Sequence, residues 1–502
     1  MTSFHPEILL VAVNARYSHC SYTIRSLQAN LGRFSQVSQC LEVDLGVQPL
    51  QLASQIVDAN PRIVSFSIYL WNVRIVESTV AILRAIAPHI RLVAGGPEIT
   101  PDYLFAKYFD AVVVGEGESS FRMLCERWLP ISTDVETKTR SSRADSAGSR
   151  ELAARRGNSG CETVVAPPEN LVALALPYHL YTETDLDQRT VYVEASRGCP
   201  YACAYCTSAN TGLRLIPLDR LLPAFDDLWK RGLRRFKFLD RSFNAPVDHA
   251  AALLDFFLAR VAPSTRLHFE INPDRIHEKI ASRIAAFPKD ALHLEVGIQT
   301  LNPSVAAAIG RSPDTADTLA NVHFLTHCTQ AVVHADLIFG LPGEDEASFA
   351  SGFNALVSTC NPAEVQVNLL KILPGTRFAH EAKERGLEFN HEPPYEVLRT
   401  DSLDFVTLMN LQCFARCWEL VHNRNRFPNA VRVLHAVCNG EYYWAYKTLA
   451  FRIHNEEGKF FAIGLPRLGQ YLRAHLVENF GVSAAEADRL IDDDLNGKKP
   501  CD

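Results

Sequence analysis

The first part of the chain alternates short apolar runs with segments of helical periodicity. Runs typical of buried strands occupy residues 7–13, 62–70, 91–96 and 110–117, with a weaker one at 37–45. Segments such as 22–34 and 75–87 repeat their apolar residues at helical spacing. Because strand and helix alternate, the pattern predicts an α/β domain with a doubly wound parallel sheet over residues 1–130. Ligands of such sheets bind outside the carboxyl ends of the strands.

A second series of strand-like runs begins near residue 185. Helical patterns separate six runs, at residues 190–196, 234–240, 266–271, 291–299, 331–340 and 363–372. Six βα units predict a partial (β/α)6 barrel over residues 185–390, whose functional side chains gather at the C-terminal ends of the strands. Residues 391–502 show mostly helical patterns and predict a helical C-terminal domain.

Residues 131–184 interrupt these patterns. Their first 40 or so positions are rich in Ser, Arg, Thr and Gly and poor in large apolar side chains. This composition predicts a partly disordered linker between the two α/β regions. The arginines could form an RNA-binding patch, but a solvated linker is the favoured interpretation.

Composition and charge restrict the class of protein. The chain has 502 residues, of which 47% are hydrophobic and 21% charged, as in ordinary globular proteins. Its formal net charge of −7 argues against nucleic acid or an anionic membrane as a partner. We find no apolar run of membrane-spanning length and no signal-peptide pattern, so we expect a cytoplasmic protein. The 13 cysteines are an odd number, which argues against a disulfide framework.

Three of these cysteines crowd into the stretch ASRGCPYACAYC, residues 195–206. Cys199, Cys203 and Cys206 follow the first barrel strand, so they are expected in a loop at the functional end of the barrel. Three thiolates can hold three irons of a 4Fe–4S cluster and leave the fourth iron open to a ligand. A structural zinc needs four closed ligands, usually in two pairs. Only Cys413 and Cys417 offer a second pair, so the cluster is the favoured interpretation.

With Tyr205 before its last cysteine, this triad resembles the signature of the radical S-adenosylmethionine (radical SAM) superfamily. The segments LEVGIQTLNPSVAAAIGR (294–311) and DLIFGLPGE (336–344) are similar to the branch that includes oxygen-independent coproporphyrinogen oxidases. The resemblance implies that S-adenosylmethionine chelates the open iron. It also implies that one electron from the cluster cleaves S-adenosylmethionine to a 5′-deoxyadenosyl radical.

By motif position, the resemblance also implies which residues contact S-adenosylmethionine. They are Tyr205 near the adenine, Glu270 and Gln299 at the ribose, Arg311 at the carboxylate and Asp336 near the methionyl amine. In the family, the second barrel strand usually ends in a Gly-Gly-Glu type of segment that binds the amine. Here it ends in FLDRSFN (238–244), so Asp240 is the candidate to replace that carboxylate.

The N-terminal sheet, with its segments AGGPEITP and VVVGEGESSF, resembles the Rossmann-like cobalamin-binding domain fused to many radical SAM enzymes. Glycines that close a strand let a large ligand approach the backbone. The resemblance implies cobalamin contacts from the strand ends: Asn14, Tyr17, Ser67, Tyr69, Trp71, Gly95, Gly96, Pro97, Glu98, Gly115, Glu116 and Gly117. The motif Asp-x-His-x-x-Gly is absent, and His19 is the loop histidine that could approach the corrin. A flavodoxin-like or nucleotide-binding sheet is the alternative.

Together the resemblances imply an enzyme with a 4Fe–4S cluster, S-adenosylmethionine and cobalamin as cofactors. We expect it to methylate an unactivated carbon of an unknown small-molecule or peptide substrate, with an electron donor such as flavodoxin or ferredoxin. Cobalamin-assisted rearrangement or oxidative cyclisation is one alternative, and radical modification of tRNA or a peptide is another. A non-enzymatic corrinoid or iron–sulfur sensor is a further alternative, but a sensor has no need of a complete S-adenosylmethionine site.

Overall fold

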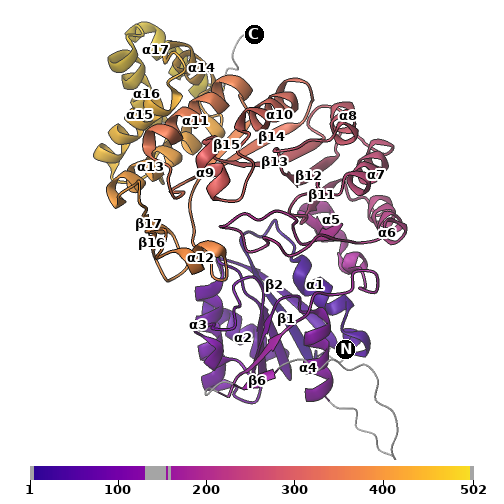
Figure 1. Cartoon of the computed structure of the whole chain (residues 1–502). Coiled ribbons are helices and arrows are strands. Elements are labelled where there is room, and N and C mark those ends of the chain that lie inside the picture. The colour runs from indigo at the N-terminus through magenta and orange to yellow at the C-terminus, as the bar shows by residue number, and fades with distance from the viewer. Residues whose placement is uncertain (1–4, 130–153, 157–159, 498–502) are drawn as a thin grey trace, which may run out of the picture. The chain divides into compact units, whose positions relative to one another are not determined.

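The computed structural model describes residues 5–129, 154–156 and 160–497. The chain divides into two compact units (Figure 1), one of residues 1–193 with 215–237 and one of residues 194–214 with 238–502. Each unit has its own buried core and is described in turn.

The first unit is built on a seven-stranded sheet with the order β2-β1-β3-β4-β5-β7-β6. The strands are β1 (Ile8–Asn14), β2 (Ser38–Asp44), β3 (Ile63–Ser67), β4 (Arg91–Gly95), β5 (Ala111–Val114), β6 (Ala154–Arg156) and β7 (Glu162–Val165). All neighbours pair in parallel except β6 and β7. The strand order reverses between β1 and β3, and ligands of doubly wound sheets bind at such a switch point.

Helices cover both faces of this sheet (Figure 1), because successive side chains of a strand point to opposite faces. Leu9 and Val11 of β1 join a core with α2 (Pro49–Ala59) and α3 (Val73–Ile86). Leu10 and Ala12 join a second core with α1 (Tyr22–Ala29) and α4 (Glu118–Trp128). The predicted doubly wound architecture is therefore confirmed.

The first unit extends further along the chain than the predicted boundary at residue 130. Strand β7 lies within the predicted linker, 131–184, and pairs with β5. Helix α5 (Glu183–Gln188) is also held to the unit, since Arg25 donates to Asp185 at 2.9 Å. Most of the Ser- and Arg-rich stretch, residues 130–153 and 157–159, lies outside the described residues, so its predicted disorder stays a prediction.

All six predicted barrel strands are present. They are β8 (Val191–Val193), β11 (Arg235–Phe238), β12 (Arg266–Ile271), β13 (Leu292–Gln299), β14 (Val332–Phe339) and β15 (Glu364–Leu369). In the first unit, β11 lies beside β8 after helix α6 (Leu218–Lys230). In the second unit, β15-β14-β13-β12 follow in that order with parallel pairing.

Helices alternate with the strands of the second unit. They are α7 (Val247–Leu258), α8 (Glu278–Ala286), α9 (Pro303–Ala308), α10 (Thr315–His327), α11 (Glu346–Cys360) and α12 (Arg377–Glu381). Strand β13 buries every second side chain, from Leu292 to Ile298, and leaves the residues between them half-buried. The half-buried positions include His293, Glu295 and Gln299, so polar side chains gather on one face of the sheet.

The end of the chain is helical, as predicted. After a short hairpin of β16 (Glu388–Phe389) and β17 (Val397–Arg399), it forms α13 (Phe405–Trp418), a π-helical turn (Glu419–Asn423), α14 (Pro428–Val437), α15 (Tyr442–Glu457), α16 (Leu465–Phe480) and α17 (Ala484–Leu495). Cys417 is fully buried on α13 and packs as an apolar residue. None of the described helices combines the length and apolar character needed to cross a membrane.

Candidate functional site

A cavity of about 180 Å³ in the second unit lies against the cysteine loop. Its wall is completed by residues of β12, β13 and β14 and of the segments that follow β11 and β12, together with Arg311. The lining residues are Cys199, Tyr201, Cys203, Tyr205, Cys206, Arg241, Ser242, Glu270, Ile271, Asn272, Glu295, Gly297, Gln299, Arg311 and Asp336. The structure thus brings together all the predicted cluster and S-adenosylmethionine residues except Asp240.

The cysteine loop is shaped by close approaches that require glycine. Gly198 has a φ of +88°, and a Cβ atom there would overlap the carbonyl oxygen of Gly212. Gly310 has a φ of +80°, and its Cβ would lie 2.5 Å from the Ala202 carbonyl oxygen. The three thiols therefore sit on a constrained loop that faces one cavity. Among the described residues, no three His, Cys, Asp or Glu side chains form a group that could hold a single metal ion.

Arg311 is anchored by the protein through two of its nitrogens. Its Nε and Nη2 donate to the two carboxylate oxygens of Asp274 at 3.0 and 2.8 Å. Nη2 also donates to the Gly297 carbonyl at 2.8 Å and to Asn272 Oδ1 at 3.0 Å. Burial lowers the pKa of Arg311, but the hydrogen bonds and charge of Asp274 more than offset this and raise it. Arg311 therefore presents a permanent positive charge to a ligand carboxylate. Because Nε and Nη2 already bind protein groups, Nη1 is the nitrogen that remains for the ligand.

Asp336 is the most strongly perturbed acid of the cavity. Burial raises the pKa of its carboxyl to about 8, and the neighbouring charges of Glu295 and Glu270 act in the same direction. These two neighbours have basic partners of their own: His268 lies 2.8 Å from Glu295, and Arg241 lies 3.9 Å from Glu270. No hydrogen bond to the Asp336 carboxyl is found from the described residues, so a cationic ligand group would be its natural partner.

Asp240 does not line the cavity. It is 2% exposed, and its carboxylate accepts hydrogen bonds from the Ala195 N–H at 2.9 Å and the Ser196 hydroxyl at 2.5 Å. Burial raises the pKa of Asp240 to about 7 despite these bonds. The structure therefore gives Asp240 a role in fixing the chain just before the cysteine loop. The next two residues, Arg241 and Ser242, line the cavity instead.

Sequence reasoning missed several lining residues, above all Asn272, Glu295 and Arg241. Glu295 had a signal, since it shares the alternating polar face of β13 with the predicted Gln299. No sequence pattern indicates Asn272, because its importance comes from its hydrogen bond to Arg311, 39 positions away.

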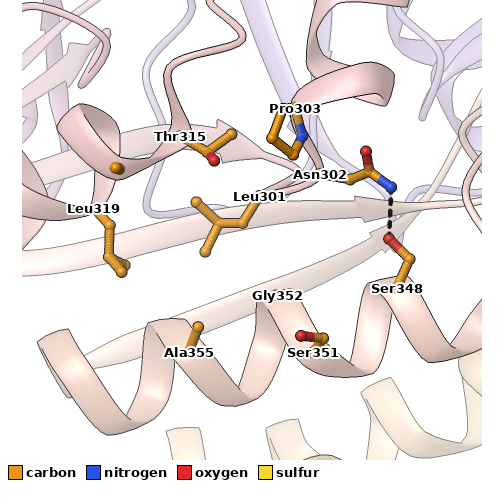
Figure 2. A pocket seen from close by; sticks show the side chains of 10 residues that line it. Leu301, Asn302, Pro303, Thr315, Leu319, Ser348, Ser351, Gly352 and Ala355 are labelled. Carbon is orange, nitrogen blue, oxygen red and sulfur yellow. Dashed lines mark hydrogen bonds between the residues drawn. The ribbon is translucent and has the colours of Figure 1, made fainter.

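A larger cavity, of about 420 Å³, lies elsewhere in the second unit (Figure 2). Residues of α10 and α11 line it together with the segment that leads into α9, where Asn302 donates to the Ser348 hydroxyl at 2.7 Å. Its lining contains apolar, hydroxyl and amide side chains and no charged one. It includes none of the predicted site residues, so its size does not make it the candidate site.

In the first unit, aromatic side chains follow the C-terminal ends of β1 and β3. The rings of Tyr69 and Trp71 stack with centroids 4.4 Å apart. The Tyr69 hydroxyl lies 2.7 Å from Thr23 Oγ1, and Trp71 Nε1 donates to the Val13 carbonyl at 3.1 Å. Because both polar tips are tied down, the pair forms a rigid and partly exposed aromatic surface. Tyr17 is 60% exposed on the β1 loop.

The glycines beyond β4 and β5 let neighbouring backbone segments pack closely at the same edge. Gly96 has a φ of +114°, and a Cβ atom there would lie 2.8 Å from the Ile68 nitrogen and closer still to its carbonyl oxygen. Gly115 has a φ of +100°, and its Cβ would lie 3.0 Å from the Ala166 carbonyl oxygen. The Ser67 hydroxyl is buried without a hydrogen-bond partner among the described residues. A buried hydroxyl without a partner at this edge fits a ligand with polar groups.

Other predicted residues of this edge are engaged within the protein. Asn14 donates to the His19 carbonyl at 2.9 Å, and Glu116 accepts from the Glu169 N–H at 2.9 Å. His19 Nδ1 lies 2.5 Å from the Tyr192 hydroxyl. Burial is the main cause that lowers the pKa of His19, followed by nearby basic side chains. Of the remaining predicted positions, Gly95 is the last residue of β4, Pro97 and Glu98 follow β4, and Gly117 follows β5; Glu98 is buried.

Comparison with known families accounts for both units. Residues 9–124 match the family described as B12 binding domain, and residues 193–353 match the radical SAM superfamily. The chain is a B12-binding radical SAM protein. Its cofactors are cobalamin, a 4Fe–4S cluster and S-adenosylmethionine, and the two sets of residues described above fit these groups.

Two curated relatives match this chain over about two thirds of its length. The chain is 27% identical to the 2-(S-pantetheinyl)-carbapenam-3-carboxylate methyltransferase of Streptantibioticus cattleyicolor over 66% of its own length and 49% of the relative's. It is also 27% identical to the cobalamin-dependent radical SAM methyltransferase TokK of Streptomyces tokunonensis, over 65% of its own length and 49% of the relative's. The B12-binding radical SAM chain thus spans about half the length of these relatives.

A solved structure supports the fold over nearly the whole chain. The cobalamin-dependent S-adenosylmethionine radical enzyme OxsB superposes with a TM-score of 0.65 at 14% sequence identity, over 98% of this chain and 80% of that one. The Rossmann-like domain, the radical SAM barrel and the helical C-terminal region are therefore all confirmed as the fold of this B12-binding radical SAM protein.

Proposed function

We propose that this chain is a cobalamin-dependent radical SAM methyltransferase that methylates an unactivated carbon of a small-molecule or peptide substrate. The observation that carries the proposal is the single cavity in which the three cysteines meet Tyr205, Glu270, Gln299, Arg311 and Asp336. The methyltransferase names of the two curated relatives support the reaction type. When bound, the cluster and S-adenosylmethionine supply a 5′-deoxyadenosyl radical, and cobalamin supplies the methyl group.

The protein's own residues bind and orient these groups in the proposed enzyme. Cys199, Cys203 and Cys206 hold the cluster from a loop that its glycines constrain. Arg311 contributes a fixed positive charge for the ligand carboxylate, and Asp336 accepts the ligand's ammonium group.

In the first unit, the proposed cobalamin site is the edge beyond β1, β3, β4 and β5. The stacked Tyr69 and Trp71 and the exposed Tyr17 offer apolar surface for a corrin ring. Ser67, the last residue of β3, contributes a buried hydroxyl that has no hydrogen-bond partner among the described residues.

The proposal includes partners and a location. Cluster reduction requires a one-electron donor such as flavodoxin or ferredoxin. We place the enzyme in the cytoplasm, because the cysteines of the described residues are free thiols and a reducing compartment keeps thiols in that state.

Turnover of the reconstituted protein tests the proposal. The full chain is purified without oxygen, loaded with iron, sulfide and hydroxocobalamin, and supplied with S-adenosylmethionine and a reductant. Formation of both 5′-deoxyadenosine and S-adenosylhomocysteine is expected, together with about one cobalt per chain. Cys203→Ala should abolish the cluster and 5′-deoxyadenosine, whereas Cys328→Ala, at an exposed cysteine that does not line the cavity, should not. Deoxyadenosine without S-adenosylhomocysteine would favour rearrangement or cyclisation, and neither product would favour a sensor.

A further inference from the structure

Asn272 follows β12 and is 4% exposed on the wall of the cluster cavity. Its backbone is fixed by one neighbouring side chain: the Asn272 N–H donates to Asn244 Oδ1 at 2.9 Å, and Asn244 Nδ2 donates to the Asn272 carbonyl at 2.8 Å. The backbone from which the Asn272 side chain extends is therefore held in a well-defined position.

The two ends of the Asn272 amide have different surroundings. Oδ1 accepts hydrogen bonds from Arg311 Nη2 at 3.0 Å and from the Asp274 N–H at 2.8 Å. Because both partners are donors, this atom must be the oxygen, and the other atom must be the nitrogen. Nδ2 is buried and has no hydrogen-bond partner among the described residues.

An unpaired buried amide is costly, so its presence on a cavity wall indicates a ligand that supplies the acceptor. Other donors face the same cavity. A Cβ atom on Gly297 would lie 2.5 Å from Gln299 Nε2 and 3.9 Å from Arg311 Nη1, so the absence of a side chain at Gly297 leaves these nitrogens accessible. Together they suit an oxygen-rich part of a ligand.

We propose that Asn272 is a ligand-binding residue of this cavity, whose Nδ2 donates to an oxygen atom of S-adenosylmethionine while its Oδ1 fixes Arg311. The acceptor is either the methionyl carboxylate or a ribose hydroxyl. This inference rests on the proposed function, because it requires that S-adenosylmethionine binds here.

The test is an affinity measurement that needs no turnover. Protein loaded with cluster and cobalamin is titrated with S-adenosylmethionine in the absence of reductant, by equilibrium dialysis. Asn272→Asp keeps the shape and the oxygen that accepts from Arg311, but removes the donor. It should weaken binding roughly 10- to 100-fold, as for a lost hydrogen bond to a charged or polar partner. Its thermal stability without ligand is measured alongside, because the variant also introduces an ionisable carboxyl beside Arg311 and Asp274.

Asn321→Asp is the matched control. Asn321 Nδ2 donates to the Pro273 carbonyl at 2.9 Å, so this variant loses a bond within the protein next to the same segment. It should lower stability and leave the affinity for S-adenosylmethionine unchanged. If Asn272→Asp fails to retain iron, Asn272→Ser is measured against the same criterion.

The outcomes separate the two claims. If the unaltered protein binds S-adenosylmethionine and the Asn272 variants bind within twofold of it, the inference about Asn272 is overturned and the proposed function stands. If the unaltered protein does not bind S-adenosylmethionine, the proposed function fails and the inference fails with it. Decarboxylated S-adenosylmethionine identifies the acceptor. If the variant and the unaltered protein bind this analogue with equal affinity, the acceptor is the carboxylate. If the variant still binds it more weakly, the acceptor is the ribose.

Discussion

Arg311 and Asp274 form a bidentate ion pair, with Nε and Nη2 of the guanidinium 3.0 and 2.8 Å from the two carboxylate oxygens. The Arg311 side chain is 7% exposed and the Asp274 side chain 14%. Because Arg311 lines the cluster cavity, Asp274 determines how Arg311 is presented to a ligand.

Replacing Asp274 by alanine should therefore be costly. It leaves a buried guanidinium without its counter-charge, a loss worth about 3–5 kcal/mol of unfolding free energy. The exposed pair between Arg283 and Asp255 is a geometric match, with both hydrogen bonds at 2.8 Å. Asp255→Ala should cost far less, since solvent screens that pair. Urea denaturation of the cluster-free proteins measures both, and equal costs would contradict the assignment.

The strands of the barrel could be predicted closely because their apolar residues alternate or cluster. Strand β12 occupies the predicted residues 266–271, and β13 differs from the predicted range at one end by a single residue. The cluster-binding loop could also be predicted, because Cys199, Cys203 and Cys206 are close in the sequence and their spacing is typical of a cluster site.

Contacts between distant segments could not be predicted in this way. The orientation of Asp240 depends on the donors Ala195 and Ser196, about 45 positions earlier, which only the folded chain brings near. The predicted linker is too long for a different reason. It includes the segment after the Ser- and Arg-rich stretch, where buried apolar residues such as Leu174 and Tyr178 pack in the first unit.

Substitution of Asp240 distinguishes its predicted role in ligand binding from its observed role in fixing the chain before the cysteine loop. Asp240→Ala leaves the Ala195 N–H and the Ser196 hydroxyl without their acceptor, which costs about 1–3 kcal/mol for each group. We expect lower stability and lower iron retention, because the cysteine loop follows directly. Molecules that keep the cluster should bind S-adenosylmethionine with unchanged affinity. A stable, iron-replete variant with impaired binding would instead support the sequence-based prediction that Asp240 holds the methionyl amine.

Gly96 should be intolerant of any side chain. Its φ of +114° is unfavourable for other residues, and the added Cβ would clash with the Ile68 backbone. Gly96→Ala should destabilise the protein by at least about 2 kcal/mol and reduce cobalt content after reconstitution. Gly95→Ala is the adjacent control, because the nearest atom to its Cβ would be 3.9 Å away. Thermal unfolding of the cobalamin-free variants and cobalt per chain are measured, and normal values for Gly96→Ala would refute the prediction.

Asp336 should make stability depend on pH. Its pKa is about 8 in the folded protein, through burial and then the charges of Glu295, Glu270 and Glu364, and is about 3.9 in an unfolded chain. Between these values the folded state holds a proton that the unfolded state has lost, so the contribution of Asp336 to stability falls as the pH rises. Above the folded-state pKa, the contribution of Asp336 to stability no longer changes with pH.

Asp336→Asn removes this dependence. Its stability relative to the unaltered protein should therefore increase from about pH 5 to about pH 8 and then remain constant. Denaturation of the cluster-free proteins across this range measures the difference. The same carboxyl must ionise to accept an ammonium group, so S-adenosylmethionine binding at pH 7 should release a proton. Calorimetry in buffers of different ionisation enthalpy detects that release. If the stability difference does not change with pH and binding releases no proton, Asp336 does not bind the ammonium group of the ligand.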